Sequence, residues 1–156
     1  MSALEIIDYV PEYRDDFERL NREWIEQHWE LEDSDHAIFA NPSVYVIDRG
    51  GAILLARCDH TIIGTCALVN MGDAQYELAK MCITADYQGR GFGKTLCQAA
   101  ISRAQQLGAQ RLILESNSVL GPAIALYRTL GFADISDHDS PYARCNVQME
   151  IRFNEA

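Results

Sequence analysis

The chain has 156 residues, of which 48% are hydrophobic and 23% are charged, and its formal net charge is −10. This length and balance predict one globular domain, residues 1–156, with a core of its own. The negative charge argues against a nucleic-acid partner, because phosphate contacts need a basic face. It mildly favours an amine-bearing substrate, although a merely soluble acidic surface explains it at least as well.

The lack of a recognisable targeting signal and the pattern of cysteines predict a cytoplasmic protein. No apolar run is long enough to span a bilayer, and the acidic stretch 1–16 is unlike a signal peptide, so we expect no membrane partner. The five scattered cysteines are typical of small core residues in a reducing compartment. For Cys82, on the predicted central strand, core packing is a better interpretation than a role as nucleophile. No His/Cys cluster has zinc-site spacing, so no metal is expected.

The first quarter of the chain predicts a strand followed by two helices. Residues 4–10 alternate loosely, as in an edge strand, and Pro11 then opens a helix, where its missing N–H costs nothing. One apolar face recurs at steps of four, three and four, through Tyr13, Phe17, Leu20 and Trp24. A second short helix ends near Pro42. Aromatic and acidic side chains mix in residues 27–43, which suits either an amine pocket or a solvated surface.

The middle of the chain predicts an antiparallel meander. Turn residues occur at 49–51, 59–60 and 72–73. The predicted strands between and around them are residues 44–47, 52–57, 61–70 and 76–84.

A glycine-rich stretch follows the last of these strands and leads into a helical pattern. Gly89, Gly91 and Gly93 let the backbone approach a ligand closely, and the first turn of a helix presents unpaired N–H groups and the positive end of its dipole. This arrangement favours an anion site, most often for phosphate, over a tight turn that binds nothing.

The spacing of the glycines narrows the class of anion site. A Walker A loop would need glycine in place of Gln88, and the dinucleotide pattern G-x-G-x-x-G would need it in place of Lys94 or Leu96. The pattern that fits is Gln-x-x-Gly-x-Gly, from Gln88 to Gly93.

The last third of the chain predicts a parallel strand, a helix and a long final strand. The helix after the loop ends at Gly108, and the buried strand 111–115 should run parallel to 76–84 through a right-handed crossover. Pro122 opens the next helix, and Gly131 closes it. Residues 143–153 alternate almost perfectly, as in an antiparallel strand with one buried face.

At two stretches the chain resembles the GCN5-related N-acetyltransferases, the GNAT family. The loop from Gln88 to Gly93 is similar to the family's pyrophosphate loop. Leu114 to Phe132, with Leu-Glu-Ser-Asn and Ala-x-x-Leu-Tyr-x-x-Leu-Gly-Phe, is similar to its later acyl-CoA half. The expected element order, β-α-α-β-β-β-α-β-α-β-β, covers nearly the whole chain. The resemblance implies an α+β fold, an α/β/α sandwich with a mixed, mostly antiparallel twisted sheet whose central parallel strand pair is splayed apart.

The resemblance also implies acetyl-CoA as co-substrate. Its pantetheine arm would add like a strand to the exposed sheet edge, and the backbone near Ile83 would polarise the acetyl oxygen. Asn117 and Tyr127 match family positions that touch the cofactor. The other residues expected to hold acetyl-CoA are Met81, Cys82, Ile83, Gln88, Gly89, Arg90, Gly91, Phe92, Gly93 and Lys94.

Two residues are candidates for the chemistry. Tyr127 is expected to protonate the departing CoA thiolate, the alternative being an aromatic core contact. Glu77 is the first candidate for the base that takes the amine proton, although it could simply pair with Lys80. The acceptor is expected to bind Trp24, Glu32 and Tyr142. Further candidates for that site are Trp29, Glu30, His138 and Arg144.

The sequence therefore predicts an N-acetyltransferase that moves acetyl from acetyl-CoA to a primary amine of a small molecule or protein, by direct attack in a ternary complex. An alternative is a non-catalytic acyl-CoA-binding sensor on the same fold. A P-loop nucleotide hydrolase is disfavoured by Gln88 and by the lack of an apolar strand ending in a magnesium-binding Asp. A homodimer through the last strand is an expectation that the sequence leaves open.

Overall fold

The computed structural model of the chain describes residues 3–135 and 145–153. The strands in this part are β1 Leu4–Asp8, β2 Ala52–Cys58, β3 Thr61–Gly72, β4 Gln75–Ile83, β5 Arg111–Ser116, β6 Ala133–Asp134 and β7 Val147–Arg152. The α-helices are α1 Arg14–Ile25, α2 Asp33–Ala40, α3 Phe92–Gln106 and α4 Gly121–Thr129. Short helical turns cover Pro11–Tyr13, Ser43–Ile47 and Ala85–Tyr87.

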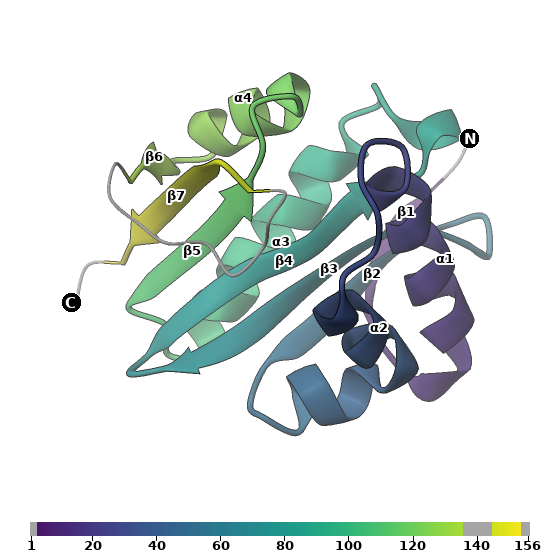
Figure 1. Ribbon diagram of the computed structural model, residues 1–156, viewed down its shortest axis with the longest axis horizontal. Coiled ribbons are helices and arrows are strands. Elements are labelled where there is room, and N and C mark those ends of the chain that lie inside the picture. Colours follow the sequence, from purple (N-terminus) through teal and green to yellow (C-terminus); the bar gives the residue numbers. More distant parts are fainter. Residues whose placement is uncertain (1–2, 136–144, 154–156) are drawn as a thin grey trace.

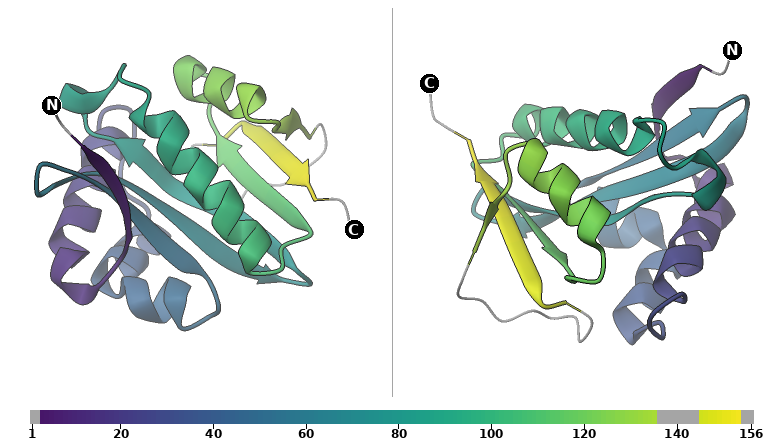
Figure 2. Two further views of the ribbon diagram at one scale, coloured as in Figure 1. Left: turned by 180° about the vertical axis from the view of Figure 1, so that it is seen from behind. Right: turned by 90° about the horizontal axis from the view of Figure 1, so that it is seen from above.

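The strands of residues 3–135 and 145–153 form one sheet in the order β1-β2-β3-β4-β5-β7-β6, and among them only β4 and β5 pair in parallel (Figure 1). Helices α1 and α2 cover one face, and α3 and α4 cover the other (Figure 2). The apolar core therefore has two halves. The half under α3 and α4 includes Leu78, Leu96 and Leu112, and the half under α1 and α2 includes Phe17 and Phe39. The predicted α/β/α sandwich is confirmed.

The N-terminal helices agree closely with the sequence pattern. A single turn at Pro11–Tyr13 leads into α1, whose Phe17 and Leu20 are fully buried under the sheet. Helix α2 ends at Ala40, just before the predicted stop at Pro42. It begins with a capping box, in which the Glu32 and Asp35 side chains bond each other's backbone N–H groups.

The strand predicted over residues 44–47 is wrong, because Ser43–Ile47 forms a π-helical turn. Pro42 already has helical dihedral angles, and the Asp48 N–H donates to the Ser43 carbonyl at 2.8 Å. The turn buries Val46 completely against the sheet. The carbonyl of Val46 accepts a hydrogen bond from the N–H of Gly51. The β-branched residues that suggested a strand pack equally well as an anchor for this turn, so tertiary packing overrides local propensity.

The parallel pair separates part of the way along, as the resemblance implied. Its register runs from Gln75 opposite Arg111 to Leu78 opposite Leu114 and stops there. Residues 79–83 of β4 continue beside β3 alone, while β5 keeps pairing with β7 as far as Ser116. The two central strands therefore diverge towards the loop before α3.

Strand β4 also carries a bulge at the point where this divergence begins. One extra residue is inserted between the positions of β4 that face Thr65 and Ala67 of β3. Lys80 lies in this bulge with a φ of +53°, in the left-handed region that residues with side chains rarely adopt. The bulge was not foreseen from the sequence.

The last predicted strand is confirmed over Val147–Arg152, while residues 143 and 144 lie outside the described part. Met149 on its inner face is fully buried. The remaining strand of the expected order is β6, which pairs with the outer edge of β7. No helix in the described ranges is long and apolar enough to cross a membrane.

Candidate active site

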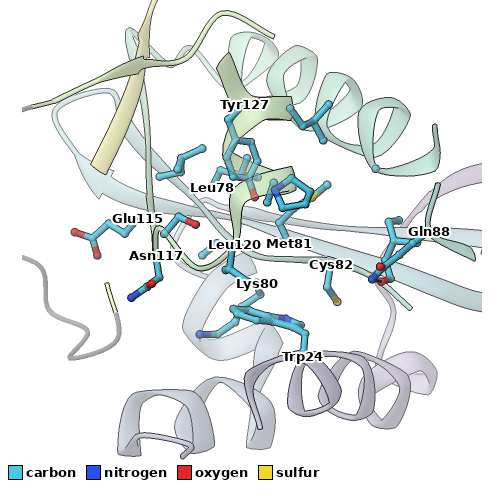
Figure 3. Close-up of a pocket in the computed structure, with 18 of the residues that line it drawn as sticks. Trp24, Leu78, Lys80, Met81, Cys82, Gln88, Glu115, Asn117, Leu120 and Tyr127 are labelled. Carbon is cyan, nitrogen blue, oxygen red and sulfur yellow. Dashed lines mark hydrogen bonds between the residues drawn. The ribbon is translucent and has the colours of Figure 1, made fainter. Parts of the chain in front are cut away.

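A cavity of about 580 Å³ opens where β4 and β5 diverge (Figure 3). Six parts of the chain form its wall: the second half of β4, the end of β5 with Asn117, the glycine-rich loop, the start of α4, the segment around the end of α1, and Cys145 before β7. It follows that the cavity connects the sheet edge to the N-terminus of α3.

The β4 edge supplies the backbone of Met81, Cys82 and Ile83, the three residues predicted to hold the pantetheine and acetyl carbonyl. All three line the cavity. Because of the bulge, Met81 and Ile83 pack towards the core under α3, whereas Cys82 packs towards α1. Burial raises the pKa of the Cys82 thiol to about 12, so the thiol is protonated at neutral pH.

The glycine-rich loop has the conformation that its glycines allow. Gly89 and Gly91 have φ angles of +80° and +81°, and a Cβ added to either would meet no atom within 4 Å. Gly93 instead lies close to the side chains of Ile83 and Leu126. A Cβ added to Gly93 would be 3.7 Å from the nearest carbon of each. The Gln88 amide nitrogen donates to the Ile83 carbonyl at 2.8 Å and ties the loop to the end of β4.

The loop delivers the chain to the N-terminus of α3. Gly91 is the N-cap, and the N–H of Thr95 is the first to bond back to its carbonyl. The amides of the preceding turn are thus available to an anion, with the positive end of the helix dipole behind them. Lys94 in this turn also lines the cavity.

Two predicted loop residues make contacts beside the cavity. The Arg90 guanidinium lies over the Tyr87 ring, 5.1 Å from its centroid, and Phe92 stacks on the same ring. Tyr87 itself is part of the cavity wall. Arg90 and Phe92 therefore brace the loop through Tyr87.

Tyr127 occupies the α4 side of the cavity and points its hydroxyl inwards (Figure 3). Its ring packs edge-on against Phe132, with centroids 5.7 Å apart. Burial raises the pKa of the Tyr127 phenol, and the neighbouring thiols raise it further, so the group holds its proton at neutral pH. This arrangement suits a proton donor.

Glu77 and Asn117 line the cavity on β4 and just after β5. Glu77 lies opposite Val69, whose side chain packs with the core under α1 and α2, so its carboxylate belongs to that face of the sheet. The Asn117 side-chain oxygen accepts from the N–H of Val119 at 3.0 Å and shapes the turn into α4. Lys80, the pairing partner considered for Glu77, places its ammonium 2.6 Å from Asp35 of α2.

The acceptor candidates are only partly brought together. Trp24 and Trp29 line the cavity, with rings 6.5 Å apart and nearly perpendicular. Glu32 is engaged in the cap of α2, and Glu30 is exposed. Tyr142, His138 and Arg144 lie outside the described residues.

Sequence reasoning missed an apolar wall at the start of α4. It is formed by Leu120, Pro122, Ala123 and Leu126. Ala123 precedes Tyr127 by four positions, so the helical period could have placed it beside the tyrosine ring. Gln27 and Tyr87 also line the cavity without having been singled out, and Glu115 and Ser116 line it as members of the Leu-Glu-Ser-Asn motif.

The described residues include no group of three or more His, Cys, Asp or Glu placed to share a metal ion. The geometry around the cavity would suit anion binding by backbone amides, strand addition at the open edge of β4, and proton transfer at Tyr127 and Glu77.

Comparison with known proteins agrees with this geometry. A sequence model of the acetyltransferase (GNAT) family matches residues 8–132. The chain is 33% identical over 88 residues to an uncharacterised N-acetyltransferase of Mycobacterium bovis, covering 56% of each protein. It is 41% identical over 59 residues to the uncharacterised N-acetyltransferase YjgM of Escherichia coli, covering 38% of this chain and 35% of that one. The chain thus spans about half or less of the length of these curated relatives.

Solved structures show the same fold. A GNAT-family acetyltransferase from Staphylococcus aureus has a TM-score of 0.88 at 21% identity, covering 96% of this chain and 99% of that one. A Salmonella typhimurium protein described as a putative acetyltransferase with its cofactor acetyl-CoA has a TM-score of 0.76 at 15% identity, with 99% and 96% coverage.

Proposed function

This chain belongs to the acetyltransferase (GNAT) family, and on that premise we propose that it transfers an acetyl group from acetyl-CoA to a primary amine of a small molecule or protein. The observation that carries the proposal is the divergence of β4 from β5 beside the glycine loop and Tyr127. This divergence exposes a strand edge that leads to an anion site at one end and to a buried proton donor at the other.

The fit of acetyl-CoA follows from the cavity wall. The pantetheine arm would bond the backbone of residues 79–83 as an added strand, which needs little from the side chains. The pyrophosphate would sit at Gly89 and Gly91, where an added Cβ finds only open space, and at the amides of the first turn of α3. Lys94 would add a positive charge beside the phosphates.

The reaction would proceed by direct attack in a ternary complex. The neutral amine forms a C–N bond with the acetyl carbonyl, and the C–S bond of the thioester breaks. The backbone of the β4 edge would stabilise the negative charge that develops on the acetyl oxygen. Tyr127 would give its proton to the departing thiolate, and Glu77, directly or through a water, would take one from the amine nitrogen.

The acceptor would enter from the side of α1 and α2. Trp24 and Trp29 form a corner of two nearly perpendicular indoles on that wall, and Glu77 lies on the same face of the sheet. An indole corner beside a carboxylate suits the apolar part and the nitrogen of an organic amine. Glu32 and Tyr142 remain candidates for the outer part of this site.

Calorimetric titration with acetyl-CoA tests the cofactor site, with ATP and magnesium as the control ligand. We expect binding of acetyl-CoA alone. Release of free CoA thiol in the presence of a panel of primary amines then tests turnover. Binding without turnover on any amine would support the acyl-CoA sensor instead, and no acetyl-CoA binding would refute both proposals.

A further inference from the structure

Four polar side chains are buried together between the sheet and the helices α1 and α2. Asn21, Asp35, Thr65 and Lys80 are each at most 5% exposed. Ser116 is the one other buried polar or charged residue in the part of the chain that the structure describes. Buried polar groups are thus concentrated at one place, next to the bulge of β4.

The four residues form a continuous chain of hydrogen bonds. The Asn21 amide donates to the Thr65 hydroxyl at 3.1 Å, and that hydroxyl donates to the backbone carbonyl of Lys80 at 2.8 Å. The Lys80 ammonium then donates to one carboxylate oxygen of Asp35 at 2.6 Å. The other oxygen of Asp35 accepts from the N–H of Glu32 at 2.9 Å. The network therefore links α1, the bulge and the start of α2.

The central member of this network is the strained residue of the bulge. Lys80 has a φ of +53°, and such a conformation persists only where the surroundings over-determine it. Here the Thr65 hydroxyl holds the carbonyl of Lys80, and Asp35 holds the far end of its side chain. The backbone that follows is that of Met81 and Cys82, which line the cavity.

The same network reaches the acceptor wall. The Trp24 indole N–H donates to the Asn21 side-chain oxygen at 3.1 Å, which fixes one ring of the indole corner. Figure 3 shows Trp24, Lys80 and Cys82 on the wall of the cavity next to α1 and α2. One set of buried hydrogen bonds thus orients both the sheet edge and an aromatic side chain of the cavity.

We propose that Asn21, Thr65, Lys80 and Asp35 are positioning residues, whose buried network fixes the β4 bulge and thereby aims the following backbone at the acetyl group. This inference rests on the proposed function. It explains why the residues are polar, because a buried ion pair can usually be replaced by apolar side chains of similar size without loss of stability. It also explains their location, because the bulge is where β4 leaves β5, and the backbone that follows, at Met81 and Cys82, lines the cavity.

Thr65→Val tests the network with little change of shape, since it removes only the hydroxyl that holds the Lys80 carbonyl. Thr65→Ser restores that hydroxyl, and Thr61→Val, at an exposed position of the same strand, is the matched control. We expect kcat of Thr65→Val to fall by about tenfold to a hundredfold while its Kd for acetyl-CoA stays within about twofold of the wild type. Thr65→Ser should recover most of kcat, and Thr61→Val should lose none.

A second readout needs no acceptor. With acetyl-CoA labelled by carbon-13 at the acetyl carbonyl, a polarising backbone moves the carbonyl resonance on binding, and Thr65→Val should lose much of this shift. The double variant Lys80→Met/Asp35→Leu removes both charges of the buried pair together and should lose kcat and the carbonyl shift in the same way. It serves the test if Thr65→Val does not fold.

The outcomes separate this inference from the proposed function. If wild-type protein binds acetyl-CoA with a shifted carbonyl and the folded variants match it in shift and kcat, the positioning role is refuted and the proposed function stands. If the variants lose acetyl-CoA affinity as strongly as kcat, the network serves cofactor binding and the positioning role is again refuted. A wild type that does not bind acetyl-CoA overturns the proposed function, and this inference with it.

Discussion

Gly91→Val tests whether the glycine-rich loop is the pyrophosphate site. Gly91 is the N-cap of α3 with a φ of +81°, and a Cβ added there would meet no atom of the protein within 4 Å. The valine side chain would therefore extend into the open space that we assign to phosphate. We expect a folded protein with a raised Kd for acetyl-CoA.

The size of the effect follows from two separate costs. A side chain in the left-handed region costs about 1–2 kcal/mol of folding free energy. In addition, the valine would keep the phosphate from approaching the backbone N–H groups closely enough to accept their hydrogen bonds. A hydrogen bond to a charged group contributes about 1.5–3 kcal/mol. Loss of one such bond raises Kd by about 10- to 100-fold.

Gly108→Val separates these two costs. Gly108 follows the other end of α3, has a φ of +87°, and also has no atom within 4 Å of an added Cβ. Both variants should therefore lose about 2–4 °C of Tm for each kcal/mol of strain. In calorimetric titration only Gly91→Val should lose affinity for acetyl-CoA. Similar losses of Tm with an unchanged Kd in both variants would refute the assignment of the loop.

Three further predictions concern single side chains. Tyr127→Phe keeps the ring packing and removes the proton, so kcat should fall by about 10²–10⁴ with unchanged affinity for acetyl-CoA, and full turnover would exclude the tyrosine as the acid. Cys82→Ala should keep its turnover, because a thiol whose pKa burial raises to about 12 is no nucleophile at neutral pH; an acetylated Cys82 in mass spectra of the wild type would contradict this. Burial raises the pKa of Glu150, but the hydrogen bonds from Arg111 and Arg152 outweigh it and leave that pKa lowered in the folded state. The carboxylate then stabilises the fold above its unfolded pKa of about 4.3, so the Tm advantage of the wild type over Glu150→Gln should shrink as the pH falls from about 7 to about 3, and a constant difference would refute the linkage.

Elements with a regular hydrophobic period could be predicted from the sequence because local pattern and tertiary packing agree in them. Of the apolar face predicted for α1, Phe17 and Leu20 are buried and Tyr13 and Trp24 are partly buried against the same core. Residues 44–47 could not be placed correctly, because Val46 would be buried in a strand as well as in the turn that it occupies. A run of β-branched residues indicates that a segment is buried against the core, but it does not determine whether the segment is a strand or a helical turn.

The site divides in the same way. Met81 to Ile83 and the three loop glycines line one cavity, and they could be singled out beforehand because strand ends and glycines mark the geometry of the chain in the sequence. The buried network could not be predicted from the sequence, because Asp35 and Lys80 are 45 residues apart and neither lies in a recognisable pattern. The bulge leaves no glycine in the sequence to mark it, since a lysine occupies the strained position.

Asp35 couples the start of α2 to the bulge of β4, because each of its two carboxylate oxygens bonds one of them. One of its oxygens completes the cap of α2 and the other neutralises Lys80 inside the bulge, so the start of α2 and the edge of β4 depend on the same carboxylate. A substitution at the start of α2 that moves this carboxylate would also move the bulge. It would then change turnover although the substituted residue contacts neither substrate. Changes of α2 that leave turnover intact are therefore expected to keep an acid at position 35, because joint replacement of Asp35 and Lys80 would still remove the acceptor of the Glu32 N–H.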